Sequence, residues 1–215
     1  MPKNIILVDD HPLVLSGIKN WLEAHSKFSV THTLKTFEEC AEVERILKQD
    51  DFIAIVDISL KKPSSFGLSG GREENQGFEI IRRFTAIGIP CIAFSSHDSG
   101  GFVERAMSEE IRAKGFVSKN ADESILLAAI NSVANGGTYV QAELVTDFLD
   151  VRDISHTFTR KEKEVADAIT LHNSNADVAA ALGISEKTVV NYLTMLYDKA
   201  GVQNKTQFLE KMGRI

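Results

Sequence analysis

Two groups of carboxylates in this chain follow short apolar segments. Asp57 comes directly after the apolar residues 52–56, and the pair Asp9 and Asp10 comes directly after the apolar residues 5–8. Continuous apolar runs of this length are typical of buried strands, so each run would deliver acidic side chains to the end of a strand. Three carboxylates that meet there repel one another unless a cation joins them. The pattern therefore indicates a divalent-cation site, and capping and solvation at a strand end remain the alternative for the acidic pair.

Two further polar residues end later apolar runs. Ser95 closes the run that begins at Cys91, and Lys119 follows the run that begins at Gly115. An acidic pair for a metal, a lone carboxylate nucleophile, a hydroxyl and an ammonium are the groups that phosphoryl transfer to an aspartate requires. The three acids, Ser95 and Lys119 are therefore the candidate functional site of the chain.

The elements between these residues predict how they are positioned. Through the first 135 residues, apolar runs alternate five times with segments of helical periodicity. This alternation predicts an α/β fold with a doubly wound, five-stranded parallel sheet and helices on both faces. Ligands of such sheets bind beyond the carboxyl ends of the strands, where the candidate residues would lie. Pro12 suits the first position of a helix, and Asn120 with Glu123 resembles a capping box.

From Thr159 the pattern is wholly helical. Thr159 and Glu162 form a second predicted capping box, residues 176–182 form a short helix that Gly183 closes, and Ser185 caps a longer helix. This order predicts an all-α helix-turn-helix domain. Residues 138–156 lack a long period and are expected to carry a short helix near 143–149 within a linker.

Length and composition suit two domains. The 215 residues are 43% hydrophobic with a net charge of -6, which is enough apolar content for two cores. Residues 155–215 contain 8 basic and 7 acidic residues, which permits a polyanion partner without requiring one. Cys40 and Cys91 are expected to be reduced core thiols. No segment has the length of a signal peptide or a membrane span, so a cytoplasmic protein without a membrane partner is expected.

Residues 3 to about 135 resemble the receiver domain of two-component response regulators. The resemblance rests on Val8-Asp9-Asp10-His11-Pro12, on Asp57 after its strand, on Phe94-Ser95-Ser96 and on Gly115-Phe116-Val117-Ser118-Lys119. It implies a flavodoxin-like domain with Asp57 as the phosphoacceptor. It also implies a Mg²⁺ site made by Asp9, Asp10, Asp57 and the backbone carbonyl of Ser59.

The resemblance assigns roles to the later residues as well. Ser95 would hydrogen-bond to the phosphoryl group, and Lys119 would pair with it. Phe116 matches the family's switch aromatic, which turns inward when the serine is drawn to the phosphate. The open alternative for Phe116 is a plain core aromatic of the last strand.

One departure from the receiver pattern is a long loop after Asp57. Receivers usually place a proline and then a glycine soon after the phosphoacceptor, whereas residues 61–76 intervene here before Gly77. Loops of this length are usually functional or disordered, and the Gly, Ser and charge content favours disorder. A second hypothesis is that Lys61, Lys62 or Arg72 folds over the phosphorylation site.

Residues from Phe158 onward resemble the LuxR-type helix-turn-helix of the NarL/FixJ class of response regulators. The matching segments are residues 159–165, 174–175, 178–179, 182–189 and 199–206. The resemblance implies that the helix after Ser185 enters the major groove of DNA by its amino end. The expected DNA-contacting residues are Lys187, Thr188, Val190, Asn191 and Thr194. A generic four-helix packing module is the alternative.

Two positions depart from this second family. Val190 and Ala176 stand where members commonly have lysine, and each loss removes a cation that could contact a phosphate or a guanine. Base reading would then fall to Asn191, which can bond adenine, and to Thr194, with Val190 touching a thymine methyl. DNA affinity would be modest, or would depend on dimerisation or on a second protein.

Together the resemblances predict a two-component response regulator and not an enzyme, with domains at residues 1–136 and 157–215 and a linker at 137–156. A sensor histidine kinase would phosphorylate Asp57, after which a homodimer would bind double-stranded DNA and regulate transcription. One alternative is a receiver that works without phosphorylation, with the helix-turn-helix domain acting partly through protein partners. A Mg²⁺-dependent phosphatase is disfavoured because no acid stands two residues after Asp57.

Overall fold

Residues 4–47, 52–60 and 76–214 are described by the structure, a computed structural model of the chain. The hypotheses on Lys61, Lys62 and Arg72 lie outside the described residues. The chain divides into two compact units: of the described residues, the first contains 4–47, 52–60, 76–98 and 105–142, and the second contains 99–104 and 143–214. Among the described residues, no helix is long and apolar enough to cross a membrane.

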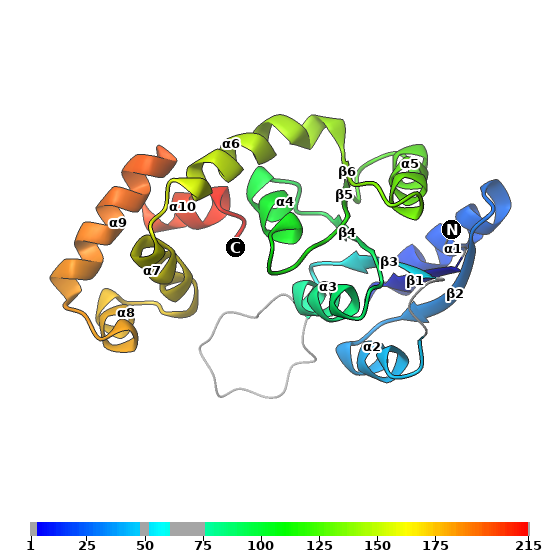
Figure 1. Cartoon of the computed structure of the whole chain (residues 1–215), viewed down its shortest axis with the longest axis horizontal. Helices are drawn as coiled ribbons and strands as arrows, with labels where there is room; N and C mark the ends of the chain where they lie inside the picture. Colours follow the sequence, from blue (N-terminus) through cyan, green and yellow to red (C-terminus); the bar gives the residue numbers. More distant parts are fainter. Residues whose placement is uncertain (1–3, 48–51, 61–75, 215) are drawn as a thin grey trace. The chain divides into compact units, whose positions relative to one another are not determined.

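A parallel sheet forms the centre of the first unit (Figure 1), with the strand order β2-β1-β3-β4-β5-β6. The strands are β1 (Asn4–Val8), β2 (Ser29–Leu34), β3 (Phe52–Asp57), β4 (Cys91–Ser95), β5 (Gly115–Ser118) and β6 (Tyr139–Val140). The central strands are buried on both faces, which explains their continuous apolar sequences. The predicted doubly wound parallel sheet is therefore confirmed.

The predicted number of five strands is one too few. Strand β6 pairs in parallel with β5, through Gly115 with Tyr139 and Phe116 with Val140. A strand of two residues has no detectable apolar period, because its pairing depends on a neighbour that is remote in sequence. Residues that were expected in a linker thus form the sixth strand.

Helices cover both faces of the sheet. The helices that follow the first five strands are α1 (Pro12–His25), α2 (Phe37–Glu44), α3 (Gln76–Ala86), α4 (Gly100–Met107) and α5 (Glu123–Ala134), and residues 99–104 at the start of α4 group with the second unit. On one face, Leu22 of α1 and Ile130 of α5 belong to a continuous core with Ile55 and Ile92 of the sheet. Pro12 is at the start of α1 as predicted. The predicted capping box at Asn120 is wrong, because α5 begins at Glu123 after Asp122.

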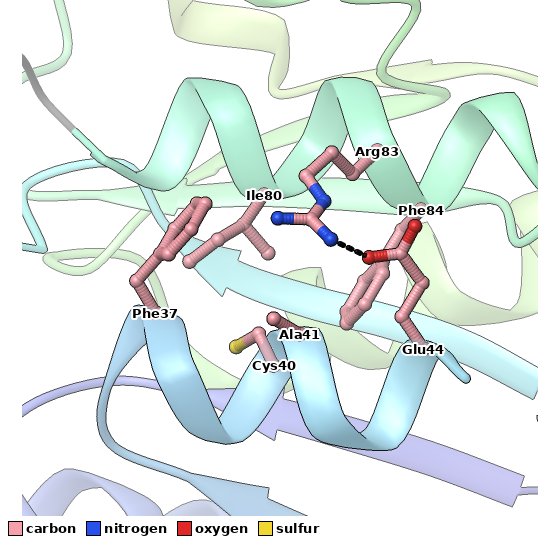
Figure 2. Close-up of a pocket in the computed structure, with 7 residues that line it drawn as sticks. All are labelled: Phe37, Cys40, Ala41, Glu44, Ile80, Arg83 and Phe84. Atoms are coloured by element: carbon pink, nitrogen blue, oxygen red, sulfur yellow. Dashed lines mark ion pairs between the residues drawn. The ribbon is translucent and has the colours of Figure 1, made fainter. Parts of the chain in front are cut away.

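Helix α3 packs on the sheet and is held from the side by α2 (Figure 2). Arg83 of α3 forms an ion pair of 2.5 Å with Glu44 of α2, and its guanidinium lies 5.2 Å from the centre of the Phe37 ring. Burial raises the pKa of the neighbouring Cys40 thiol to about 12, so Cys40 is a packing residue and not a reactive thiol. The contact has no space for a water molecule. It fixes α3, whose first turn reaches the carboxyl end of β3.

The second unit is helical. The 3₁₀ helix η2 (Ala142–Leu144) leads into it, and it contains the α-helices α6 (Val145–His156), α7 (Arg160–Leu171), α8 (Asn175–Leu182), α9 (Glu186–Ala200) and α10 (Lys205–Lys211). Its core includes Val165, Ile169, Val178, Leu196 and Phe208. Helix α6 extends well beyond the short helix expected near residues 143–149.

The helix-turn-helix follows the predicted signals closely. Gly183 adopts a left-handed conformation with a φ of 65° between α8 and α9, which a glycine adopts without strain. The Ser185 side chain then caps α9 by accepting a hydrogen bond from the Thr188 N–H at 3.1 Å. The capping box of Thr159 and Glu162 is also present at the start of α7. The predicted all-α second domain is therefore confirmed.

Candidate functional site

Acidic side chains meet where strands β1 and β3 end. Because the two strands are parallel neighbours, Asp9 follows β1 alongside Asp57, the last residue of β3. The ligand atoms of Asp9, Asp10, His11 and Asp57 all lie within 4.8 Å of one another. The fold thus brings the three candidate carboxylates together, and it adds a histidine that the sequence did not single out.

Lys119, directly after β5, joins two of these carboxylates. Its Nζ lies 2.8 Å from Asp57 Oδ2 and 2.7 Å from Asp9 Oδ2. The Asp57 side chain is 1% exposed and that of Asp9 is 4% exposed. Such a buried arrangement depends on the counter-charge, because either carboxylate alone would be an uncompensated buried ion.

Burial and ion pairing have opposite effects on the pKa values of Asp57 and Lys119. Burial raises the pKa of Asp57, against the lowering effects of Lys119 and of the hydrogen bond from the Ser59 N–H. Burial by itself would lower the pKa of Lys119, but the carboxylates of Asp57 and Asp9 raise it above its ordinary value. Lys119 therefore stays an ammonium, which is the form that can pair with an anion.

The oxygen atoms at this site suit a divalent cation. Asp57 Oδ1 accepts a hydrogen bond of 2.9 Å from the Ser59 N–H. Asp57 Oδ2 and Asp9 Oδ2 are buried, and neither accepts a well-oriented hydrogen bond from the described residues, although both lie beside the Lys119 ammonium. Hard divalent cations prefer such carboxylate oxygens. The acidic pocket of Asp9, Asp10 and Asp57 is compatible with a divalent metal ion.

His11 lies at the rim of the pocket. Its Nδ1 atom is 2.7 Å from Asp10 Oδ1 and 3.1 Å from Asp9 Oδ1, and its backbone N–H donates to Asp9 Oδ1 at 2.8 Å. Pro12 begins α1 directly after it. The short turn between β1 and α1 therefore orients the acidic pair.

Ser95 and Phe116 lie on the strands beside this pocket. Ser95 is fully buried at the end of β4, where its Oγ accepts a hydrogen bond of 2.9 Å from the His97 N–H. Its backbone carbonyl accepts the Lys119 N–H at 2.7 Å, so Ser95 is adjacent to the lysine. Phe116 is fully buried in β5. An inward-facing ring fits both a switch aromatic and a plain core aromatic.

The exposed side of α9 carries most of the candidate DNA-contacting residues. Val189, Leu193 and Leu196 face the core, whereas Lys187, Val190, Asn191 and Thr194 are exposed. Thr188 is only partly exposed, and its hydroxyl is 2.8 Å from that of Ser185. A solvent-facing row on a capped helix is what a recognition helix presents to a groove.

Models of two protein families match the chain. Residues 5–131 match the response regulator receiver domain, and residues 156–212 match the bacterial regulatory proteins of the luxR family. The receiver match alone covers more than half of the chain. The chain therefore belongs to the two-component response regulators, and its receiver and LuxR-type DNA-binding domain are those of the NarL/FixJ class.

Individual relatives resemble the chain over nearly its whole length. The transcriptional regulatory protein UhpA of Escherichia coli (strain K12) is 28% identical over 208 residues, covering 97% of this chain and 96% of that protein. The transcriptional regulatory protein DegU of Brevibacillus brevis is 26% identical over 225 residues, covering 94% and 89%. These relatives are regulators of transcription and not enzymes.

A solved structure has the same fold. RcsB from Salmonella enterica serovar Typhimurium, bound to a promoter in the presence of the phosphomimetic BeF3-, has a TM-score of 0.68 at 20% identity. The match covers 100% of this chain and 99% of that one.

Proposed function

We propose that a sensor histidine kinase phosphorylates this response regulator on Asp57, and that the phosphorylated protein dimerises and binds double-stranded DNA to regulate transcription. The observation that carries the proposal is the buried Asp57 carboxylate, held 2.8 Å from Lys119 beside two further acids. Relatives that are named transcriptional regulatory proteins, and the promoter-bound RcsB, support the DNA-binding part.

The chemistry is a nucleophilic displacement at phosphorus. One carboxylate oxygen of Asp57 attacks the phosphoryl group of a phosphohistidine, so that an O–P bond forms, the N–P bond breaks and the electron pair leaves with the imidazole. Asp9, Asp10, Asp57 and the Ser59 backbone carbonyl are proposed to hold Mg²⁺. When bound, Mg²⁺ neutralises charge on the phosphoryl oxygens. No general base is needed, because an ionised carboxylate has no proton to lose.

The readout begins with the groups around the new phosphoryl group. The Ser95 hydroxyl accepts a hydrogen bond from the His97 N–H, so its own proton is available to donate to a phosphoryl oxygen. The Lys119 ammonium is proposed to move from the two carboxylates to the phosphoryl anion. Phe116, on the strand that leads to Lys119, is the proposed aromatic of the switch.

Incubation with acetyl phosphate and Mg²⁺ tests the proposal. The wild type is expected to gain one phosphoryl group by mass, and Asp57→Asn is expected to gain none. Selection from a random DNA pool with both phosphorylated and untreated protein then measures sequence preference and its dependence on phosphorylation. A wild-type protein that takes up no phosphoryl group would falsify the central claim.

A second candidate function has one structural observation in its favour. Val190 is 47% exposed and Met195 is 42% exposed on α9, and solvent-facing apolar side chains suit a protein partner as well as a thymine methyl. In this version the receiver works without phosphorylation and the helix-turn-helix domain acts partly through protein partners. DNA binding that has no sequence preference and a flat salt dependence would favour it.

A further inference from the structure

Gln141 directly follows β6, and its side chain continues the pairing between β6 and β5. The Gln141 N–H donates to the Phe116 carbonyl at 3.3 Å, which is the next backbone bond of the parallel ladder. The return bond of a parallel ladder would normally go to the backbone carbonyl of residue 141. Here the Ser118 N–H donates instead to Gln141 Oε1, at 2.9 Å.

This side-chain bond frees the main chain to turn away at once. Gln141 is followed directly by η2 (Ala142–Leu144), and that helix continues into α6 (Val145–His156). Gln141 is 9% exposed and Ser118 is 2% exposed, so the bond between them is shielded from water. Figure 1 shows β6 beside β5 at this edge of the sheet.

The two groups that Gln141 binds belong to the strand that carries the switch residues. The Phe116 carbonyl and the Ser118 N–H flank Val117, and Lys119 is the next residue after Ser118. Lys119 bridges Asp57 and Asp9 through its ammonium and bonds to Ser95 through its backbone N–H. A displacement of the end of β5 must therefore either move Gln141 with it or break these hydrogen bonds.

We propose that Gln141 is a positioning residue that couples the end of β5, and with it Lys119, to the chain segment that leads into the DNA-binding unit. This role rests on the proposed phosphorylation of Asp57. When Lys119 turns to the phosphoryl group, Gln141 transmits the shift of β5 to the start of η2. Leaving the buried Ser118 N–H without an acceptor is strongly disfavoured. Gln141 therefore moves with the end of β5 and keeps this hydrogen bond.

The substitutions Gln141→Ala and Gln141→Glu test the coupling in the full-length protein. Alanine removes the acceptor for the Ser118 N–H, whereas glutamate keeps an oxygen acceptor at the same reach. The measured quantity is the ratio of DNA affinities with and without acetyl phosphate and Mg²⁺. The probe is a duplex selected from a random pool by the phosphorylated wild type.

For Gln141→Ala we expect normal phosphoryl uptake by mass and a response ratio lowered by about fivefold, the effect of one hydrogen bond. Gln141→Glu is expected to keep most of the wild-type ratio. A merely structural role would lower the stability of both states and leave the ratio unchanged. A wild-type ratio in folded Gln141→Ala therefore overturns the coupling role and leaves the proposed function standing.

Hydrogen exchange of the wild type provides a test that does not depend on a variant that folds. Protection of the Gln141 and Ser118 amides is expected to change upon phosphorylation, and identical protection in both states overturns the coupling role. A wild type that takes up no phosphoryl group overturns the proposed function itself, and the coupling role is then overturned with it.

Discussion

The backbone of Gly77, in the first turn of α3, lies directly against the main chain at Asp57. A Cβ atom on residue 77 would come within 2.1 Å of the Asp57 carbonyl oxygen and 2.4 Å of Ile58 Cα. Both neighbours are backbone atoms of a buried strand end, so neither can move aside cheaply. Only glycine allows α3 to approach the proposed phosphoacceptor this closely.

We therefore expect Gly77→Ala to disturb the site as well as the fold. The added methyl group must push α3 away from β3 or displace the Asp57 backbone, and overpacking of this kind costs about 1–3 kcal/mol. Urea unfolding should show the loss of stability, and the rate of phosphoryl uptake from acetyl phosphate should fall with it.

Gly17→Ala is the matched control. Gly17 lies inside α1, and a Cβ atom there would meet nothing within 4 Å. Alanine in an unobstructed helical position stabilises by about 0.4–1 kcal/mol. If Gly77→Ala were as stable as Gly17→Ala, the close approach of α3 to Asp57 would be wrong.

A second prediction concerns the competition between Lys119 and a divalent cation. Lys119→Met leaves Asp9 and Asp57 buried side by side without their shared counter-charge, so its midpoint temperature in EDTA should be below that of the wild type. Mg²⁺ should raise the midpoint more in the variant than in the wild type, because the ion no longer competes with an ammonium.

Lys114→Met is the control for this prediction. Lys114 is exposed and precedes β5 at its other end, so its replacement should leave the Mg²⁺-dependent shift unchanged. Equal Mg²⁺-dependent shifts in Lys119→Met and the wild type would show that the ammonium and the ion do not share the site.

A third prediction uses Glu162, which ties α7 to α9. Burial opposes its charge, but its pKa is lowered from the ordinary 4.5 by Lys199, whose Nζ lies 2.7 Å away, and by bonds from Thr159. A lowered folded-state pKa stabilises the protein above the unfolded value, and this stabilisation is lost as the pH falls through the folded value. Glu162→Gln should therefore be less stable than the wild type at pH 7, with a gap that narrows below pH 4.5.

The same substitution on the same helix is the control. Glu164 pairs with Lys161 and Arg160 at the surface, where ion pairs contribute little. Glu164→Gln should therefore have nearly the same stability as the wild type, both at pH 7 and below pH 4.5. A pH-independent gap for Glu162→Gln would assign its effect to packing instead of to the ion pair.

Local sequence signals were sufficient for most of the fold and for the set of acids. Apolar runs identified the central strands because those strands are buried on both faces, and each acid after a run lies at the common carboxyl edge. The box at Thr159 and Glu162 was predictable because both partners lie within one turn. Asn120 and Glu123 have the same spacing, but Asn120 lies in the turn after β5, where its N–H donates to Ser118 Oγ, and α5 begins only at Glu123.

Long-range contacts were not readable from the sequence. Gly77 was visible only as a residue after a long loop, and its contact with Asp57 depends on how α3 is set against β3. Gln141 carries no motif, and its acceptor role exists only because the two-residue β6 brings it beside Ser118. In both cases the partner is at least 20 residues away in sequence, beyond the reach of a periodic pattern.

The last prediction concerns Val190, an exposed apolar residue of α9. Val190 is 47% exposed on the same side of α9 as Lys187, so a lysine fits there without disturbing the core. Each added phosphate contact steepens the dependence of log affinity on log salt by about 0.9. Val190→Lys should therefore bind DNA more tightly at low salt, with a slope steeper by about one.

Thr146→Lys adds the same charge on α6, at an exposed position, and should change the slope little. If both variants steepened the slope equally, the effect would come from net charge, and α9 would not be the surface that faces DNA.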